Sequence, residues 1–256
     1  MEGPAGGTRL IGQRFFDELA AREGLSVVRD APAGLMEPFA LLQGPGFEPE
    51  RVAPEIRRFY EVTSEYQLDV WSEWSGFFRP FGQLLALLFS RRLEQLNVPL
   101  TPLASSRGMS SELVQLVEPG SGRRRYTGWV RSNPATQETV YVGSYSVAEI
   151  PGHPAPCVKV VFPLPNGNAT VIMRPSIEPD GSLVLESCGS AFGDPGFYFL
   201  VCRNPQEAWV KQLRTFREKI HVFTENDELR TDHVFNLWGR PFLRLHYRMQ
   251  LARAAA

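Results

Sequence analysis

The sequence predicts a predominantly antiparallel β fold, built as a β-barrel or as a strongly curved sheet with a calycin-like or lipocalin-like layout. Residues 66–74 alternate apolar and polar side chains, which is the period of a strand with one buried face. From residue 111, about ten apolar segments separated by turn-forming residues continue almost to the C-terminus. Such a succession is typical of consecutive hairpins, and closing them into a barrel would remove exposed sheet edges.

Two helices are predicted before the first strand. In residues 8–23, apolar side chains recur at helical spacing. Thr8 is a good N-cap for this helix, and Gly24 is a good terminator. Pro54 opens a second short helix, because proline is well tolerated in the first turn.

The chain is predicted to consist of an N-terminal part, residues 1–53, and one antiparallel β-rich domain, residues 54–256. The N-terminal part ends in a Pro/Gly-rich stretch that suits an irregular wrap. This stretch is too apolar for a free linker, so we expect it to lie against the folded body.

A helical insertion at about residues 77–97 is predicted to follow the first strand and to cap the sheet. Arg79, Arg91 and Arg92 interrupt its apolar run. About a dozen apolar residues remain where a bilayer span needs about 20, so no integral membrane span is predicted. The insertion suits a buried helix, a lid over a pocket or an interfacial helix. As a cap over one end of a barrel, it resembles the layout of fatty-acid-binding proteins.

The strands after the insertion alternate with strong turn signals. The best of these is Pro165-Asn166-Gly167-Asn168, because Asn-Gly tolerates the positive φ angles of a type I′ hairpin turn. A short helix is predicted at residues 205–213. The alternative fold is an α+β helix-grip, as in steroid-transfer-like domains, although those usually end on a long helix and this chain ends on strands. The predicted strands are residues 111–118, 125–131, 138–150, 157–164, 169–174, 182–187, 197–203, 215–224, 229–238 and 242–249.

The last three predicted strands place three polar side chains on one apolar face. A tight turn at residues 225–228 makes His233 a diagonal neighbour of Glu218. A second turn at residues 239–241 pairs His233 with Tyr247. The opposite face then carries mostly charged side chains, and this clean separation supports the register, since a slip of one residue would exchange the two faces.

Glu218, His233 and Tyr247 are therefore the candidate catalytic residues. In an apolar cavity, a carboxylate and an imidazole can move protons, and a tyrosine can donate to a developing oxyanion. Two other interpretations stay open: the three groups orient a ligand without catalysis, or they satisfy one another inside a filled core.

Large apolar side chains are predicted to line a ligand pocket. The predicted ligand-binding residues are Trp71, Trp74, Phe162, Met173, Phe216, Phe235 and Tyr247.

Other polar candidates are weaker than the Glu-His-Tyr cluster. His221 and Asp232 suit a surface pair, His153 lies in a rigid loop, and Asp194 is a turn former.

Composition excludes several classes of function. A formal net charge of −1 and a pI near 6.5 argue against nucleic-acid binding, which needs clustered excess cations. No nucleotide loop or metal-ligand spacing is present, so neither a cofactor nor a metal is predicted. The three cysteines are odd in number and widely spaced, which argues against a disulfide framework. The unpaired cysteines, together with the absence of a visible secretory signal, favour a cytoplasmic location. The arginine-rich composition suggests a bacterial source.

Three functions remain on these grounds. The first is a soluble cytosolic protein that binds a small apolar molecule inside the barrel or curved sheet. The second is a cofactor-free cyclase, isomerase or hydratase that uses the Glu-His-Tyr cluster. The third is a structural or protein-interaction domain with a filled core.

Overall fold

The structure is a computed structural model that describes residues 3–7, 11–29, 32–75, 110–133, 139–204 and 207–252. The predicted helical insertion at residues 77–97 lies outside these ranges. In the described residues, the antiparallel fold class is confirmed, and the chain forms one sheet of thirteen strands.

Within the described ranges, two α-helices and three short 3₁₀ turns precede or flank the first long strands. The helices are α1 (Phe15–Glu23) and α2 (Pro54–Glu61), and the 3₁₀ turns are η1 (Phe39–Leu42), η2 (Pro49–Arg51) and η3 (Thr63–Glu65). The strands are β1 (Ser26–Val28), β2 (Tyr66–Trp74), β3 (Ser110–Val117), β4 (Arg124–Ser132), β5 (Thr139–Ala148), β6 (Cys157–Leu164), β7 (Gly167–Ile177), β8 (Leu183–Glu186), β9 (Phe197–Asn204), β10 (Glu207–Gln212), β11 (Phe216–Glu225), β12 (Glu228–Leu237) and β13 (Arg240–Leu251).

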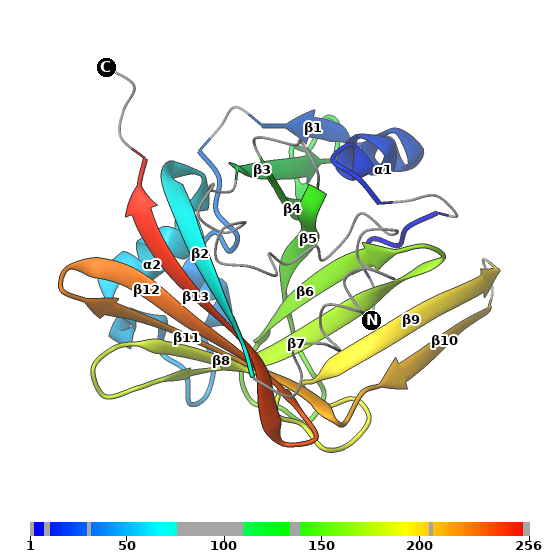
Figure 1. Ribbon diagram of the computed structural model, residues 1–256. Helices are drawn as coiled ribbons and strands as arrows, with labels where there is room; N and C mark the ends of the chain where they lie inside the picture. The colour runs from blue at the N-terminus through cyan, green and yellow to red at the C-terminus, as the bar shows by residue number, and fades with distance from the viewer. Residues whose placement is uncertain are drawn as a thin grey trace.

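The sheet is curved and open. Its main path runs β1-β3-β4-β5-β6-β7-β8-β11-β12-β13-β2, so its two ends, β1 and β2, do not pair with each other. Of the two predicted forms, the structure therefore has the curved sheet. Figure 1 shows β2 and β11 to β13 on one side of the molecule, with β3, β4 and β5 on another.

Strand β7 changes partner along its length and so carries the bend. Residues 167–171 pair with β9, whereas residues 174–177 pair with β8. The hairpin of β9 and β10 consequently leaves the main path as an arm (Figure 1). The helix predicted at residues 205–213 is wrong, because residues 207–212 form β10 and complete this arm. Pairing with β9 overrides the weak local helical pattern.

The tight turns explain which predicted pairings hold. Asn226 and Asp227 both have positive φ, which a two-residue type I′ turn requires, and the predicted pairing of β11 with β12 is confirmed. The turn after β12 is not at residues 239–241 but at Trp238 and Gly239, again with positive φ. This turn pairs Leu237 with Arg240, a shift of three residues from the predicted register, and a β-bulge between Phe235 and Asn236 reduces the shift to two, so Tyr247 pairs with Thr231. Because the remaining shift is even, Tyr247 keeps its predicted face.

Helix α1 covers the outer face of β3 and β4. It begins at Phe15, later than the predicted start at Thr8, and the preceding Gly12 disfavours an earlier helical turn. Phe16 and Leu19 pack against Val114 and Leu116 of β3, away from the main core. Helix α1 thus covers the outer face of β3 and β4, and the side chains on their other face point into the main core.

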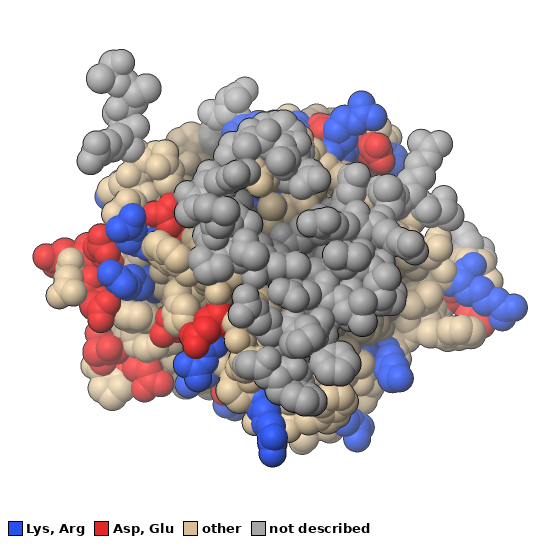
Figure 2. All heavy atoms as spheres, viewed as in Figure 1, with Lys and Arg blue, Asp and Glu red and all other residues tan. Residues whose placement is uncertain are grey.

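The Pro/Gly-rich segment and α2 pack into the main core on the inner side of the sheet. Leu35, Phe39 and Leu42 belong to the same buried cluster as Ile56 of α2 and the inner side chains of the strands. Figure 2 shows acidic side chains gathered at the left, over the end where β11 turns into β12.

Gly167, at the hairpin between β6 and β7, provides a test of this topology. A Cβ at this position would lie 1.9 Å from the backbone oxygen of Leu200 on β9. We expect Gly167→Ala to lower the free energy of unfolding by about 1–3 kcal/mol, measured by urea denaturation, because the two strands must separate. Gly7→Ala is the matched control, since a Cβ there meets nothing within 4 Å. Equal effects of the two substitutions would contradict the pairing of β7 with β9.

Candidate functional site

The curved sheet encloses an interior cavity of about 120 Å³. Its lining is mostly apolar, with a small number of polar groups from strands far apart in the sequence. The wrap and α2 contribute to it, so the N-terminal part and the sheet together form the site. The lining residues are Leu35, Phe59, Tyr60, Leu68, Trp129, Arg131, Tyr141, Tyr145, Val160, Phe162, Val171, Met173, Leu185, Glu218, Ile220, Thr231, His233, Tyr247 and Met249.

One wall of the cavity is formed by β4 and β5. Trp129 and Arg131 alternate inward on β4, and Arg131 pairs across the ladder with Tyr141. The hydroxyls of Tyr141 and Tyr145 lie 2.7 Å apart. Gly143, between the two tyrosines, permits this contact, because a Cβ there would lie 2.5 Å from the Tyr141 hydroxyl.

The facing wall holds the predicted Glu218 and His233. Glu218 is 6% exposed, and its Oε2 lies 3.0 Å from Nε2 of His233. A carboxylate can only accept, so the imidazole N–H donates in this contact. The hydroxyl of Ser187 accepts from the backbone N–H of Glu218 at 2.7 Å and so anchors β11 at this point. Phe235 lies beside the imidazole, with ring centroids 3.9 Å apart.

Tyr247 lines the same cavity, but no hydrogen bond joins it to His233 in the described residues. Instead, the guanidinium of Arg131 lies 5.5 Å from the centre of its ring. Burial raises the pKa of Tyr247, and the positive charge of Arg131 together with a side-chain hydrogen bond between the two residues opposes that shift. Burial likewise raises the pKa values of Tyr141 and Tyr145. The predicted triad is therefore a Glu-His pair with a tyrosine that contacts an arginine.

Arg131 is a charged lining residue that the sequence did not predict. It is 5% exposed, and its guanidinium lies between the rings of Trp129 and Tyr247, 5.2 Å and 5.5 Å from their centres. Its Nε and Nη2 atoms are buried and have no hydrogen-bond partner among the described residues. Trp129 and Arg131 alternate onto one strand face, but an arginine is more typical of a solvent-exposed face, so the sequence carries no signal for a buried site here.

The predicted apolar lining residues separate into three groups. Phe162, Met173 and Tyr247 line the cavity. Phe216, Phe235 and Trp74 contribute to an adjoining aromatic cluster through Phe242. Trp71 does not reach the interior: it is 44% exposed and pairs with His246 on the outer face, because it alternates with the inward Val70.

The outer face of β12 and β13 carries ion pairs rather than a second site. Asp232 is bonded by Nδ1 of His246 at 2.6 Å, not by the predicted His221. His221 instead contacts the Ser182 hydroxyl at 2.9 Å, and Arg248 pairs with Asp69 at 2.9 Å. These groups are partly exposed, so each pair contributes little to stability.

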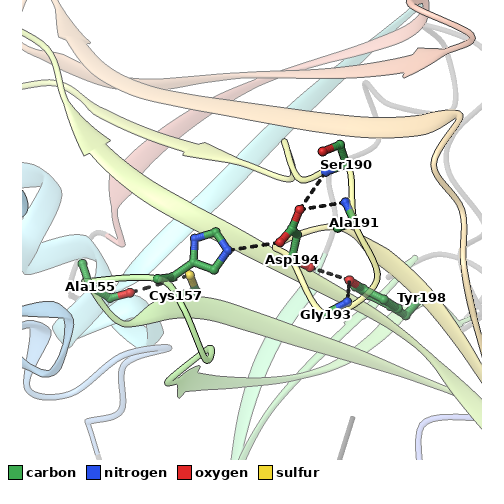
Figure 3. Close-up of polar contacts among 8 residues, drawn as sticks. Ala155, Cys157, Ser190, Ala191, Gly193, Asp194 and Tyr198 are labelled. Carbon is green, nitrogen blue, oxygen red and sulfur yellow. Dashed lines mark hydrogen bonds and ion pairs between the residues drawn. The ribbon is translucent and has the colours of Figure 1, made fainter.

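His153 and Asp194 form a structural loop contact. Figure 3 shows the Asp194 carboxylate turned toward the backbone N–H groups of Ser190 and Ala191, which donate to it at 2.9 Å and 2.8 Å. These bonds hold the pKa of Asp194 below its usual value, and Nε2 of His153 adds a longer contact at 3.5 Å. The Tyr198 hydroxyl closes the loop by donating to the backbone oxygen of Asp194. These contacts hold the turn.

In the part of the chain that the structure describes, no group of three or more His, Cys, Asp or Glu side chains is arranged to hold a metal ion. The polar side chains of the cavity lie beside a lining that is mostly apolar.

Comparison with known proteins gives one informative match. No protein-family model matches the chain, and no solved structure does. The chain is 30% identical over 243 residues to the uncharacterized membrane protein YndJ of Bacillus subtilis strain 168. The match covers 94% of this chain but 41% of that relative, so the chain spans less than half the relative's length. Within the described residues, no helix has the length and apolar character to cross a bilayer.

The interior tyrosines predict a specific dependence of stability on pH. Their pKa values are raised in the folded state, so the native protein retains protons that the unfolded chain releases above about pH 10. Stability should be complete below that pH and should fall as the pH rises further. We expect phenolate absorbance to appear together with unfolding, and Tyr145→Phe to show a shallower loss of stability. Free ionisation of all seven tyrosines near pH 10 in the folded protein would contradict the interior cluster.

Proposed function

We propose that the protein binds a small, largely apolar molecule in the interior cavity. The observation that carries this proposal is the cavity itself, which is apolar over most of its surface and has polar groups on two facing walls. A filled core would leave no such space, so the cavity favours ligand binding over a purely structural role.

The size of the cavity limits the ligand. A volume of about 120 Å³ is below the roughly 300–1,000 Å³ of pockets that enclose drug-sized molecules. It is close to that of an apolar cavity of about 150 Å³ that holds benzene in another protein. The proposed ligand therefore places a group about the size of one aromatic ring between Trp129 and the β7 side chains Val171 and Met173.

The site also supports a second candidate, a cofactor-free enzyme of the cyclase, isomerase or hydratase type. The 3.0 Å contact between His233 and Glu218 beside an apolar cavity favours this candidate. The carboxylate would orient the imidazole, and His233 would act as the acid or base.

His233→Gln separates the two candidates, because glutamine still donates to Glu218 but cannot exchange a proton during a reaction. For a binding protein, we expect ligand affinity to change by less than about threefold. For an enzyme, we expect turnover to fall by about 100-fold or more. The measurement is ligand affinity and product formation by mass spectrometry, and His246→Gln, on the outer face, is the control.

We also propose that this part of the chain works on the cytosolic side. Cys157, Cys188 and Cys202 are all free thiols in the structure, as is usual in a reducing compartment. The relative is named a membrane protein, so a cytosolic site beside a membrane is compatible with this placement.

A cavity-filling variant tests the binding proposal. Native mass spectrometry of the protein from its own host should reveal a bound small molecule, and toluene should bind to the emptied protein in an NMR titration. Val160→Phe adds volume to the lining and should reduce toluene affinity by about tenfold or more. Val201→Phe makes the same change on a residue that is 50% exposed and should have no effect. Absence of any bound small molecule, with no toluene binding, would contradict the proposal.

A further inference from the structure

We propose that the ligand of the interior cavity carries a carboxylate that is bound by Arg131. This inference rests on the proposed function and specifies the chemical class of the ligand. Among the described residues, the Nε and Nη2 donors of Arg131 are buried and have no hydrogen-bond partner.

An unpartnered buried guanidinium is costly, so the cavity requires an acceptor. A buried charged donor without an acceptor loses its hydration and gains no hydrogen bond in return, and native proteins rarely leave such groups unmatched. In the described residues, no carboxylate lies within ion-pair distance of Arg131. Glu218 is on the facing wall and its Oε2 is engaged by His233 at 3.0 Å. Glu218 can balance the charge of Arg131 across the cavity, but it leaves the two donors unsatisfied.

The geometry of the two free donors favours a carboxylate. Nε–H and one N–H of Nη2 lie along the same edge of the planar guanidinium and point in parallel. This edge matches the two oxygens of a carboxylate, which it binds in a bidentate manner. A carbonyl would satisfy one donor and leave the other unpaired.

The surroundings of Arg131 hold it in place for this role. Its guanidinium lies between the rings of Trp129 and Tyr247, so its position is restricted from both sides. Trp129 is itself fixed by an indole N–H that donates to the Ser111 hydroxyl. An aromatic or short branched carboxylic acid would place its two oxygens on Arg131 and its apolar body toward Val160 and Met173.

Binding of benzoate, benzamide and toluene to the wild-type protein tests the inference. Benzamide has the shape of benzoate without the charge, and toluene lacks the acceptor group. By isothermal titration calorimetry, we expect benzoate to bind at least about tenfold more tightly than benzamide. We also expect the ¹⁵Nε signal of Arg131 to shift with benzoate and to stay unchanged with toluene.

Arg131→Met removes both donors while keeping an unbranched side chain. We expect it to lower benzoate affinity by about 10-fold to 100-fold and to leave toluene affinity within about twofold. Arg131→Lys keeps the charge without the paired donors and should give an intermediate loss. Arg240→Met, at an exposed position, is the matched control.

The outcomes separate this inference from the proposed function. If toluene and benzamide bind as tightly as benzoate, and Arg131→Met changes nothing, the carboxylate inference is overturned while apolar binding stands. If none of the three compounds binds the wild-type protein, the proposed function itself fails. If Arg131→Met does not fold, the benzoate-to-benzamide ratio and the ¹⁵Nε shift of the wild-type protein decide the question.

Discussion

The pairing of β11 with β12 is the constraint on which the interior of this protein depends. In an antiparallel ladder, a slip of one residue would turn every side chain of β12 to the other face. Glu218 and His233 would then lie on different sides of the sheet, and the buried carboxylate would lose the donor that satisfies it. The Asn226-Asp227 turn prevents this slip, because both residues adopt the positive φ angles of a two-residue hairpin.

The curvature of the sheet turns this local pairing into a cavity. Strand β7 pairs with β9 at one end and with β8 at the other, and the sheet bends where the partner changes. As a result, β4 comes to face β13, and Arg131 reaches across the interior to Tyr247. These two residues are far apart in the sequence and on strands that do not pair with each other.

The polar side chains of the interior are of two kinds, those that form hydrogen bonds with one another and those with unpaired donors. The Glu218 and His233 side chains satisfy each other, and the hydroxyls of Tyr141 and Tyr145 do the same. Arg131 differs from these pairs, because its Nε and Nη2 donors have no acceptor among the described residues. Native interiors tolerate unpaired buried donors where a ligand supplies the acceptor, and the unpaired donors of Arg131 are the basis of the proposed binding site.

Residue patterns predicted the parts of the fold that depend on neighbours in the sequence. The antiparallel class, the start of α2 at Pro54 and the pairing of β11 with β12 were all predictable, since alternation and turn chemistry act over a few residues. The turn at Trp238 was not, because a positive φ at tryptophan has no sequence signature. The prediction of a helix in residues 205–213 was wrong because pairing with β9 outweighs local preference.

The sequence by itself determined that Glu218 and His233 share one face, since strand alternation and the two-residue turn require it, whereas Tyr247 stays on that face because a β-bulge between Phe235 and Asn236 offsets the displaced turn. Only the tertiary structure decided what that face meets. The bend at β7 brings Arg131 opposite these residues, while Trp71 alternates to the outside. Alternation specifies the side of a strand, but the partner across a cavity depends on how the whole sheet curves.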